Sequence, residues 1–274
     1  MLERELNETI RIARDAGRIL LNIYATEFGV AYKGATDPVT DADTAANAFI
    51  VAELAKLFPE DGIVAEETAD RSGAVGKSRC WYVDPLDGTK EFIAKNGEFS
   101  VMIGLAIEGR AELGVVYQAG HDKLYAGVVG QGANLYRGGE KTALRVSEIA
   151  DPKDLKLVVS RSHRDKATDA LVSRLGITSE RPSGSVGVKV GLITEREADF
   201  YIHPSNKSSR WDACAPDALL HAAGGIFLDL AGERYTYDAV QIPNERGIFA
   251  CNAVCTPKVL DVAREVARAG GLPV

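Results

Sequence analysis

The chain has 274 residues, of which 46% are hydrophobic and 26% are charged, and its formal net charge at pH 7 is -7. This length exceeds the size at which single hydrophobic cores stop growing, so one large or two medium domains of an ordinary globular protein are expected. The acidic balance disfavours non-specific binding to nucleic acid polymers or anionic membranes, so an anionic substrate must be attracted by local cations or metal ions.

The first half of the chain predicts two helices followed by short strands. Apolar residues spaced mostly by three and four over residues 1–24 predict an amphipathic helix, and a second helix is predicted over residues 39–58. Strands are predicted at residues 63–65 and 80–83. Four more strands, joined by short glycine-containing connections typical of antiparallel hairpins, follow at residues 99–108, 111–118, 123–129 and 133–136.

The second half changes to an alternation of strands and helices. We predict a strand at 156–160, a helix at 165–175, a strand at 189–194, and further elements at 200–202 and 213–223. Because such alternation is typical of α/β architecture, we expect an N-terminal α+β domain over residues 1–150 and a C-terminal α/β domain over residues 151–274.

The compartment can also be predicted. The first helix lacks the apolar core of a signal peptide, and no stretch is apolar and long enough to span a membrane, so we expect a cytoplasmic protein. The four cysteines are scattered, without the paired spacing of a zinc site, and are expected to be reduced, buried thiols.

Asp84 and Asp87 lie three residues apart at the end of an apolar strand and are followed by Gly88 and Thr89. Strand-end carboxylates offer oxygen ligands to a hard cation, and the turn that follows offers backbone N–H groups to an anion. Their spacing, D-x-x-D-G-T, differs from the D-x-D-x-T of haloacid-dehalogenase-type phosphatases. The run therefore indicates metal-dependent phosphate chemistry of another kind.

Three further acids, Asp43, Glu66 and Asp212, fall where strands end or helices begin. Each alone has a simpler explanation, as a helix cap, a helix-dipole partner or a solvated charge. A cluster of all five would require a cation to neutralise it, and Mg²⁺ suits an all-oxygen ligand set that is completed by phosphate.

Four motifs, in this order, resemble those of the inositol monophosphatase superfamily of magnesium-dependent, lithium-sensitive phosphatases. They are D-P-V-T-D-A-D at 37–43, A-E-E at 65–67, D-P-L-D-G-T at 84–89, and W-D at 211–212 with A-G-G at 223–225. The resemblance implies the layered αβαβα sandwich of the inositol monophosphatase and fructose-1,6-bisphosphatase type, with two or three Mg²⁺ ions bound between its two halves. It also implies a small-molecule substrate and a monomer or homodimer.

The same resemblance implies roles for individual residues. The metal ligands would be Glu66, Asp84, Asp87, Asp212 and the backbone carbonyl of Leu86. Asp43 and Thr89 would orient an attacking water, and the backbone N–H groups of Gly88 and Thr89 would bind phosphate. The implied reaction is a direct in-line attack by water, without a phosphoenzyme.

Other segments resemble the 3'(2'),5'-bisphosphate nucleotidases, which act on a by-product of sulfate activation and sulfotransfer. They are residues 87–93, 96–99, 159–163, 184–189 and 211–217; after D-G-T the chain has K-E-F, where inositol phosphatases usually have T-N-F. The implied reaction removes the 3'-phosphate of adenosine 3',5'-bisphosphate to give AMP, with 3'-phosphoadenosine 5'-phosphosulfate as a further candidate substrate. The implied substrate contacts are Ser160, Arg161, His163, Gly184, Ser185 and Lys189.

Alternatives remain at this point. The metal motifs also fit an inositol or sugar monophosphatase, and a metal-dependent nucleotide-binding regulator without turnover belongs to a different class. Arg161 and Lys189 could be solvated charges, and His163 could cap a helix. Residues 203–210 match no part of the family pattern, so Lys207 or Arg210 could contact a second phosphate, or the segment could be a plain polar loop.

Overall fold

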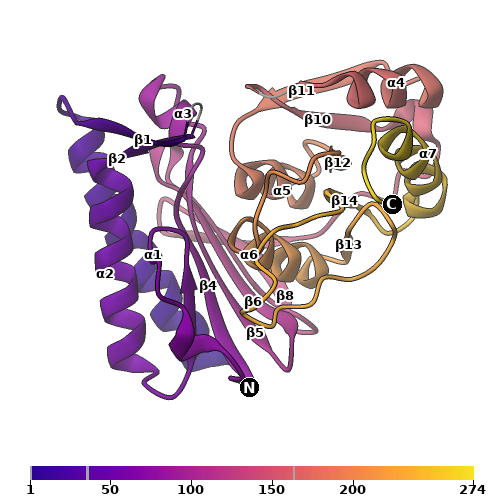
Figure 1. Ribbon diagram of the computed structural model, residues 1–274. Coiled ribbons are helices and arrows are strands. Elements are labelled where there is room, and N and C mark those ends of the chain that lie inside the picture. Colours follow the sequence, from indigo (N-terminus) through magenta and orange to yellow (C-terminus); the bar gives the residue numbers. More distant parts are fainter. Residues whose placement is uncertain (1, 35–36, 163) are drawn as a thin grey trace.

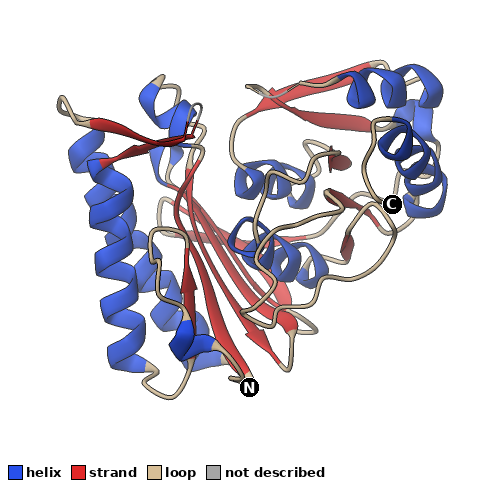
Figure 2. Cartoon of the chain, in the orientation of Figure 1, coloured by secondary structure: helices blue, strands red, loops and turns tan. Residues whose placement is uncertain are grey.

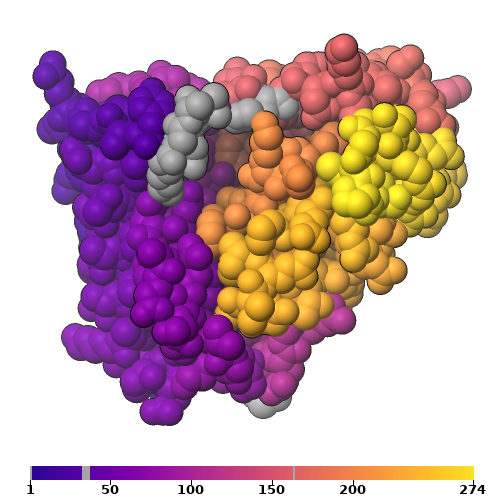
Figure 3. Space-filling model, in the orientation of Figure 1, coloured from indigo at the N-terminus to yellow at the C-terminus, as the bar shows by residue number. Residues whose placement is uncertain are grey.

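The computed structural model describes residues 2–34, 37–162 and 164–274. Within them, two large β-sheets alternate with three layers of helices, as Figure 1 and Figure 2 show, and a third sheet has only two strands. This layering confirms the expected αβαβα sandwich. On the face drawn in Figure 3, the N-terminal and C-terminal parts of the chain pack side by side.

The helices and strands have the following bounds. The helices are α1 (Glu3–Tyr24), α2 (Asp41–Leu57), α3 (Thr89–Ile93), α4 (Lys166–Leu175), α5 (Val186–Thr194), α6 (Arg210–Ala222) and α7 (Thr256–Ala269), with 3₁₀ turns at Ser72–Ala74, Ala119–His121 and Pro152–Asp154. The strands are β1 (Val30–Gly34), β2 (Asp37–Thr40), β3 (Gly62–Ala65), β4 (Arg79–Asp87), β5 (Ser100–Ile107), β6 (Arg110–Gln118), β7 (Lys123–Val128), β8 (Gly132–Arg137), β9 (Glu140–Leu144), β10 (Lys156–Ser160), β11 (Ser179–Ser183), β12 (Phe200–His203), β13 (Gly225–Leu228) and β14 (Ile248–Asn252).

A seven-stranded sheet runs in the order β3-β4-β5-β6-β7-β8-β9, with β3 parallel to β4 and the other neighbours antiparallel. The helices α1 and α2 cover one face, where Trp81 and Val83 of β4 lie in their core. Cys80 and Tyr82, which alternate with Trp81 and Val83 along the strand, pack into the core on the other face of the sheet. Alternate residues thus pack on both faces, which makes this sheet an internal layer.

The middle layer consists of α5 and α6, which lie against the other face of the seven-stranded sheet. Gly104 of β5 pairs with Gly114 of β6 directly beneath α6. A Cβ atom at Gly114 would lie 2.1 Å from the carbonyl oxygen of Ala215, so a side chain there would push the helix away. The paired glycines therefore set how closely α6 approaches the sheet.

The second sheet runs in the order β11-β10-β12-β14-β13, with β10 parallel to both its neighbours and β14 antiparallel to both of its own. Its inner face contacts α5 and α6, and α4 and α7 pack together on its outer face (Figure 1). All four cysteines are buried and free of disulfides, as predicted. In the described parts of the chain, every helix is too short or too polar to cross a lipid bilayer.

The predicted strand at 189–194 is wrong, because these residues form the second part of helix α5. An unbroken apolar run fits a buried helix as well as a buried strand, and periodicity alone does not separate the two. Because α5 lies between two sheets, residues 187–194 are all buried and no polar face marks the helical period.

Candidate active site

The first carboxylates of the site come from two neighbouring parallel strands, β3 and β4. Ala65 of β3 pairs with Val83 of β4, and the backbone N–H of Glu66 donates a 3.0 Å hydrogen bond to the Val83 carbonyl. Glu66, the first residue after β3, therefore lies beside Asp84, which is still within β4. Both line a large cavity of about 680 Å³.

A bulge in β4 turns Asp84 and Asp87 toward the same face. Asp84 pairs with Met102 and Asp87 with Ser100, so three residues of β4 span two residues of β5. Without the extra residue, carboxylates three positions apart would point to opposite faces of the sheet. Pro85, which cannot donate to a ladder, is accommodated in this irregular stretch.

The turn after Asp87 requires a glycine. Gly88 has φ of 94° and is the N-cap of α3. An L side chain is disfavoured in this region, and a Cβ atom would lie 3.1 Å from the Glu98 carbonyl oxygen. The turn starts α3 beside the carboxylates, with Gly88 and Thr89 both lining the cavity as the sequence predicts.

Asp212 reaches the same cavity from α6. It is the third residue of the helix, and its Oδ2 accepts a 2.5 Å hydrogen bond from the backbone N–H of Ser209, the N-cap. One oxygen from each of Asp84, Asp87 and Asp212 lies within 4.8 Å of the others. Residues 128 positions apart in the sequence (84 and 212) are thus brought together by the packing of α6 on the seven-stranded sheet.

This cluster is electrostatically strained when no cation is bound. Burial, followed by repulsion from Glu66 and Asp87, raises the pKa of both Asp84 and Asp212 well above the ordinary value of a carboxyl. Burial also raises the pKa of Asp87, although Lys189 opposes this shift. Buried like charges with only oxygen donors fit a hard divalent cation, since a cation would neutralise them and complete their coordination.

Asp43 and Thr89 form a hydrogen-bonded pair next to the cluster. The Thr89 hydroxyl lies 3.1 Å from Asp43 Oδ1 and 3.2 Å from the Leu86 carbonyl oxygen. Asp43 Oδ2 accepts from the backbone N–H and hydroxyl of Thr40, at 2.7 and 2.6 Å, in a capping box at the start of α2. Burial, more than any other cause, raises the pKa of Asp43. Thr89 lines the cavity, and Asp43 lies behind it.

Across the cavity, the structure places four of the six expected substrate contacts. They are Ser160 at the end of β10, Gly184 and Ser185 before α5, and Lys189 within α5. The Lys189 ammonium lies 4.9 Å from the centre of the Tyr201 ring, and burial lowers its pKa. Lys189 is therefore a buried cation rather than a solvated charge.

Ser185 contacts the carboxylate cluster in a way that the sequence did not indicate. Its hydroxyl donates a 2.5 Å hydrogen bond to Asp87 Oδ2, lies 2.9 Å from the Ser100 hydroxyl, and accepts from the Val188 N–H. Its φ is 52°, in a region that non-glycine residues seldom adopt. Strained backbone at such a contact indicates that the surrounding structure holds Ser185 against Asp87.

Arg161 is not brought to the cavity. Its guanidinium forms two hydrogen bonds with the Glu98 carboxylate, at 2.6 and 2.7 Å, and Glu98 also accepts from the Gly184 N–H at 2.8 Å. Arg161, which was expected to contact the substrate, therefore forms an ion pair between the two halves of the chain. The other expected contact, His163, lies outside the described residues.

Some residues that line the cavity were missed by the sequence. Tyr201 lies on β12 within an ordinary apolar strand, which carries no signal of a binding role. Glu98 does not line the cavity itself, but it belongs to a segment that matches the nucleotidase pattern, so its position was marked although its contacts were not. Lys207, Ser208 and Ser209, from the segment without a counterpart in the pattern, also line the cavity.

Comparison with known proteins gives consistent results. The model of the inositol monophosphatase family matches residues 1–266. The 3'(2'),5'-bisphosphate nucleotidase CysQ of Escherichia coli K12 is 34% identical over 241 residues, which cover 85% of this chain and 93% of that protein. Nus factor SuhB of the same organism is 31% identical over 239 residues, covering 83% and 85%.

A solved structure agrees with the arrangement of layers. The extragenic suppressor protein suhB of Bartonella henselae superposes with a TM-score of 0.83 at 25% sequence identity, covering 96% of this chain and 99% of that one. The likeness extends over nearly the whole of both chains, so it includes both sheets and all the helices that carry the carboxylates.

Proposed function

This chain belongs to the inositol monophosphatase family of phosphomonoesterases, and from that premise we propose that it removes the 3'-phosphate of adenosine 3',5'-bisphosphate in a Mg²⁺-dependent reaction, giving AMP and phosphate. The observation that carries the substrate assignment is the pairing of two kinds of charge in one cavity. The carboxylate cluster occupies one side, and Lys90, Lys189 and Lys207 line the remainder. A substrate with two phosphates can use both.

The size of the cavity supports a nucleotide. Its volume of about 680 Å³ falls within the range of about 300–1,000 Å³ that is usual for sites of small organic ligands. The similarity to CysQ nucleotidases supports the same assignment, because it covers 85% of this chain and 93% of the Escherichia coli protein. By the same argument, 3'-phosphoadenosine 5'-phosphosulfate is a second candidate substrate.

We propose that Glu66, Asp84, Asp87, Asp212 and the Leu86 carbonyl would hold the magnesium ions. Bound there, Mg²⁺ would neutralise the developing charge on the phosphoryl oxygens and make a water more acidic. The N–H groups at the start of α3 would bind the phosphate.

The residues beside this cluster can handle a proton. The Thr89 hydroxyl has one hydrogen, and both Asp43 Oδ1 and the Leu86 carbonyl oxygen are within reach of it. When it is donated to Asp43, the lone pairs of Thr89 are left to accept a hydrogen bond from a water in the cavity. Asp43, with its raised pKa, is suited to take the proton that the water loses. Its second oxygen stays bound to Thr40, which keeps the carboxylate in place.

The substrate assignment is tested by measuring kcat/KM with Mg²⁺ for adenosine 3',5'-bisphosphate, 3'-phosphoadenosine 5'-phosphosulfate, inositol 1-phosphate and fructose 1,6-bisphosphate. We expect adenosine 3',5'-bisphosphate to be preferred over the inositol and sugar esters by at least about tenfold, equivalent to about 1.4 kcal/mol of transition-state binding. AMP serves as the control for position, because it retains only the 5'-phosphate and should not be hydrolysed.

Two results would contradict the proposal in different ways. A preference for inositol 1-phosphate would leave the phosphatase chemistry intact and reassign the substrate. Mg²⁺-dependent nucleotide binding without release of phosphate from any ester would instead identify a binding protein without turnover.

A further inference from the structure

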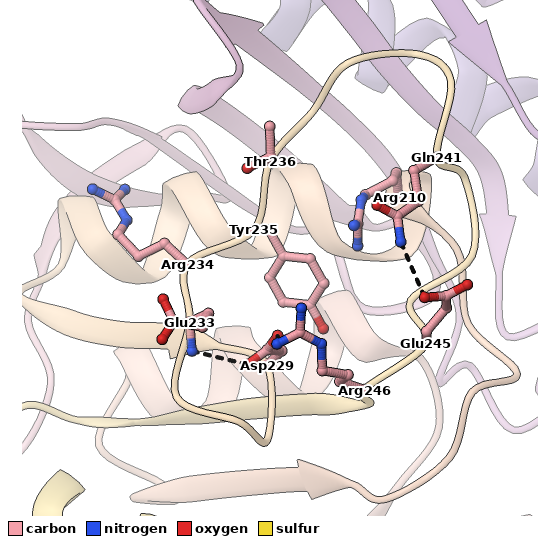
Figure 4. Close-up of a pocket in the computed structure, with 9 residues that line it drawn as sticks. All are labelled: Arg210, Asp229, Glu233, Arg234, Tyr235, Thr236, Gln241, Glu245 and Arg246. Carbon is pink, nitrogen blue, oxygen red and sulfur yellow. Dashed lines mark hydrogen bonds and ion pairs between the residues drawn. The ribbon is translucent and has the colours of Figure 1, made fainter. Parts of the chain in front are cut away.

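A second, smaller polar cavity lies beside the first turn of α6, and Figure 4 shows the residues that line it. Its volume is about 110 Å³. Arg210, the first residue of α6, lines this cavity, whereas its neighbours Ser209 and Trp211 line the large one. The two cavities are therefore separate but share the start of one helix.

Arg210 is buried without an ionic partner. Its exposed fraction is 7%, its Nε is fully buried with no hydrogen-bond partner, and its Nη1 donates to the neutral amide oxygen of Asn244. The guanidinium carbon lies 4.8 Å from the centre of the Tyr235 ring. Among the described residues, no carboxylate forms an ion pair with it.

This is an unfavourable place for a positive charge. Buried charges in proteins are normally paired, because leaving one uncompensated costs several kcal/mol. Arg210 also lies at the N-terminus of a 13-residue helix, where the helix dipole favours negative rather than positive charge. The position therefore favours an anion from outside the chain.

Of the three acids that line this cavity, Asp229 and Glu245 are engaged with residues other than Arg210, and the side chain of Glu233 forms no ion pair with Arg210. Asp229 pairs with Arg246 at 3.3 Å, and Glu245 accepts from the Gln241 side chain at 3.2 Å. Figure 4 shows Arg246 extending toward Tyr235, while Arg234 points away from the other two arginines. Arg246 thus adds a second positive group to the walls without supplying a partner for Arg210.

We propose that this cavity binds a small tetrahedral oxyanion, sulfate or inorganic phosphate, against the guanidinium of Arg210. Because Nη1 is held by Asn244 and Nε is fully buried, Nη2 is the guanidinium atom that remains to donate to an oxygen of such an anion, and the N-terminus of α6 adds a favourable dipole. The volume is too small for a nucleotide or a sugar phosphate, whose sites are usually about 300 Å³ or larger. The expected ligand class is therefore the free inorganic anion.

The site is connected to the large cavity by hydrogen bonds. Asn244, which holds Arg210, also donates to the Ser208 hydroxyl at 3.1 Å and to the Ser209 carbonyl at 2.7 Å. The Ser209 N–H in turn binds Asp212. An anion on Arg210 would therefore fix the segment that borders the carboxylate cluster.

Thermal unfolding of the metal-free protein in EDTA tests the proposal, with sodium sulfate and sodium phosphate titrated separately at constant ionic strength. For the wild type, we expect a saturable rise in Tm of about 3–5 °C at an anion concentration about ten times the Kd. Sulfate also stabilises proteins in general by its exclusion from their surface, but that effect does not saturate. The anion with the lower apparent Kd is the ligand that the site prefers.

Two variants separate this site from other anion contacts. Arg210→Gln should lose the saturable rise, whereas Arg234→Gln, which removes the same charge from the same cavity wall, should keep it. Anion binding near Lys189 would be equal in both. The proposal is overturned if the wild type shows no saturable rise, or if Arg210→Gln retains it.

A structural measurement covers the case in which Arg210→Gln does not fold. Wild-type crystals soaked in selenate, an isostere of sulfate with an anomalous signal, should show a peak within hydrogen-bonding distance of the Arg210 guanidinium. Selenate bound only at other places would overturn the proposal.

Discussion

On one wall of the large cavity, carboxylate oxygens of Asp84, Asp87 and Asp212 lie within 4.8 Å of one another, and burial raises the pKa of all three carboxyls. Beside a second wall, which Gly184, Ser185 and Lys189 line, Arg161 is bound to Glu98, and Ser162 donates to Glu91 at 2.6 Å. The first wall holds crowded carboxylates that a cation would stabilise, whereas the ion pair and hydrogen bond beside the second wall form without a ligand. Crowded like charges are therefore a better guide to binding than single residues of the right chemical type.

The largest effect on activity is expected from removing one charge from the first wall. Asp84→Asn should lower kcat/KM at fixed Mg²⁺ by about a thousandfold or more, or about 4 kcal/mol, because a ligand of the cation is lost. Asp70→Asn, at an exposed turn, is the control and should be neutral. Steady-state kinetics with the nucleotide substrate provide the measurement, and retention of a tenth of the activity would contradict the assignment of Asp84.

A smaller loss is expected from Thr89, which stands between the cluster and Asp43. Thr89→Val keeps the shape of the side chain but removes the hydroxyl that links the cavity to Asp43, so kcat should fall by about a hundredfold with little change in KM. Thr89→Ser should recover most of the rate. Equal rates for the valine and serine variants would exclude a role for the hydroxyl.

The stability of the metal-free protein should depend on pH in the direction set by the first wall. Because the pKa of Asp84 and of Asp212 is raised in the folded state, the folded protein holds protons that the unfolded chain releases above about pH 4. Stability should therefore decrease as pH rises through the folded pKa.

The measurement compares Tm in EDTA at pH 5 and pH 7.5. We expect the wild type to melt at least about 3 °C higher at pH 5, a shift that corresponds to about 1 kcal/mol, and we expect Mg²⁺ at pH 7.5 to restore the loss. Asp84→Asn should reduce the difference between the two pH values. An unchanged difference in that variant would show that other groups cause it.

The smallest effect is expected from the second wall. Glu98→Gln weakens the hold on Arg161 and Gly184, and so loosens Ser185 against Asp87. We expect about a threefold to tenfold increase in the Mg²⁺ concentration for half-maximal activity, which matches about 1 kcal/mol for one charge-assisted hydrogen bond. Glu180→Gln, which breaks the exposed ion pair with Arg164, is the matched control.

An unchanged Mg²⁺ dependence in Glu98→Gln would show that the second wall acts independently of the cluster. An equal increase in the Mg²⁺ requirement of Glu180→Gln would mean that the effect comes from a general loss of stability.

The sequence was sufficient to predict the carboxylate cluster because its members follow local rules. Strand ends and helix starts are recognisable along the chain, and parallel strands such as β3 and β4 bring their ends to one edge. The same local rules predicted α1, α2 and the hairpins from β5 to β8. The family motifs supplied the association of Asp212 with the rest, which no local pattern contains.

The second wall could not be predicted in this way. Arg161 and Glu98 are 63 residues apart, and a guanidinium that matches a motif looks the same whether it faces a ligand or a carboxylate. The period of α5 is hidden by burial on all sides. The edge strands β9 and β11 are largely exposed and lack an apolar alternation. The helix α7 did carry a signal, since Val259, Ala263 and Val266 lie on one buried face.

Asp43 and Asp212 each use one oxygen to bind the backbone N–H three residues earlier, at the start of a helix. Under the proposed function, each side chain therefore has two roles, one in folding and one in chemistry. An asparagine at either position could keep the capping hydrogen bond while losing the carboxylate, which offers an evolutionary route from an enzyme to a folded relative without turnover. Such a descendant would differ from its ancestor by a single atom at each position, and its fold would show no trace of the change.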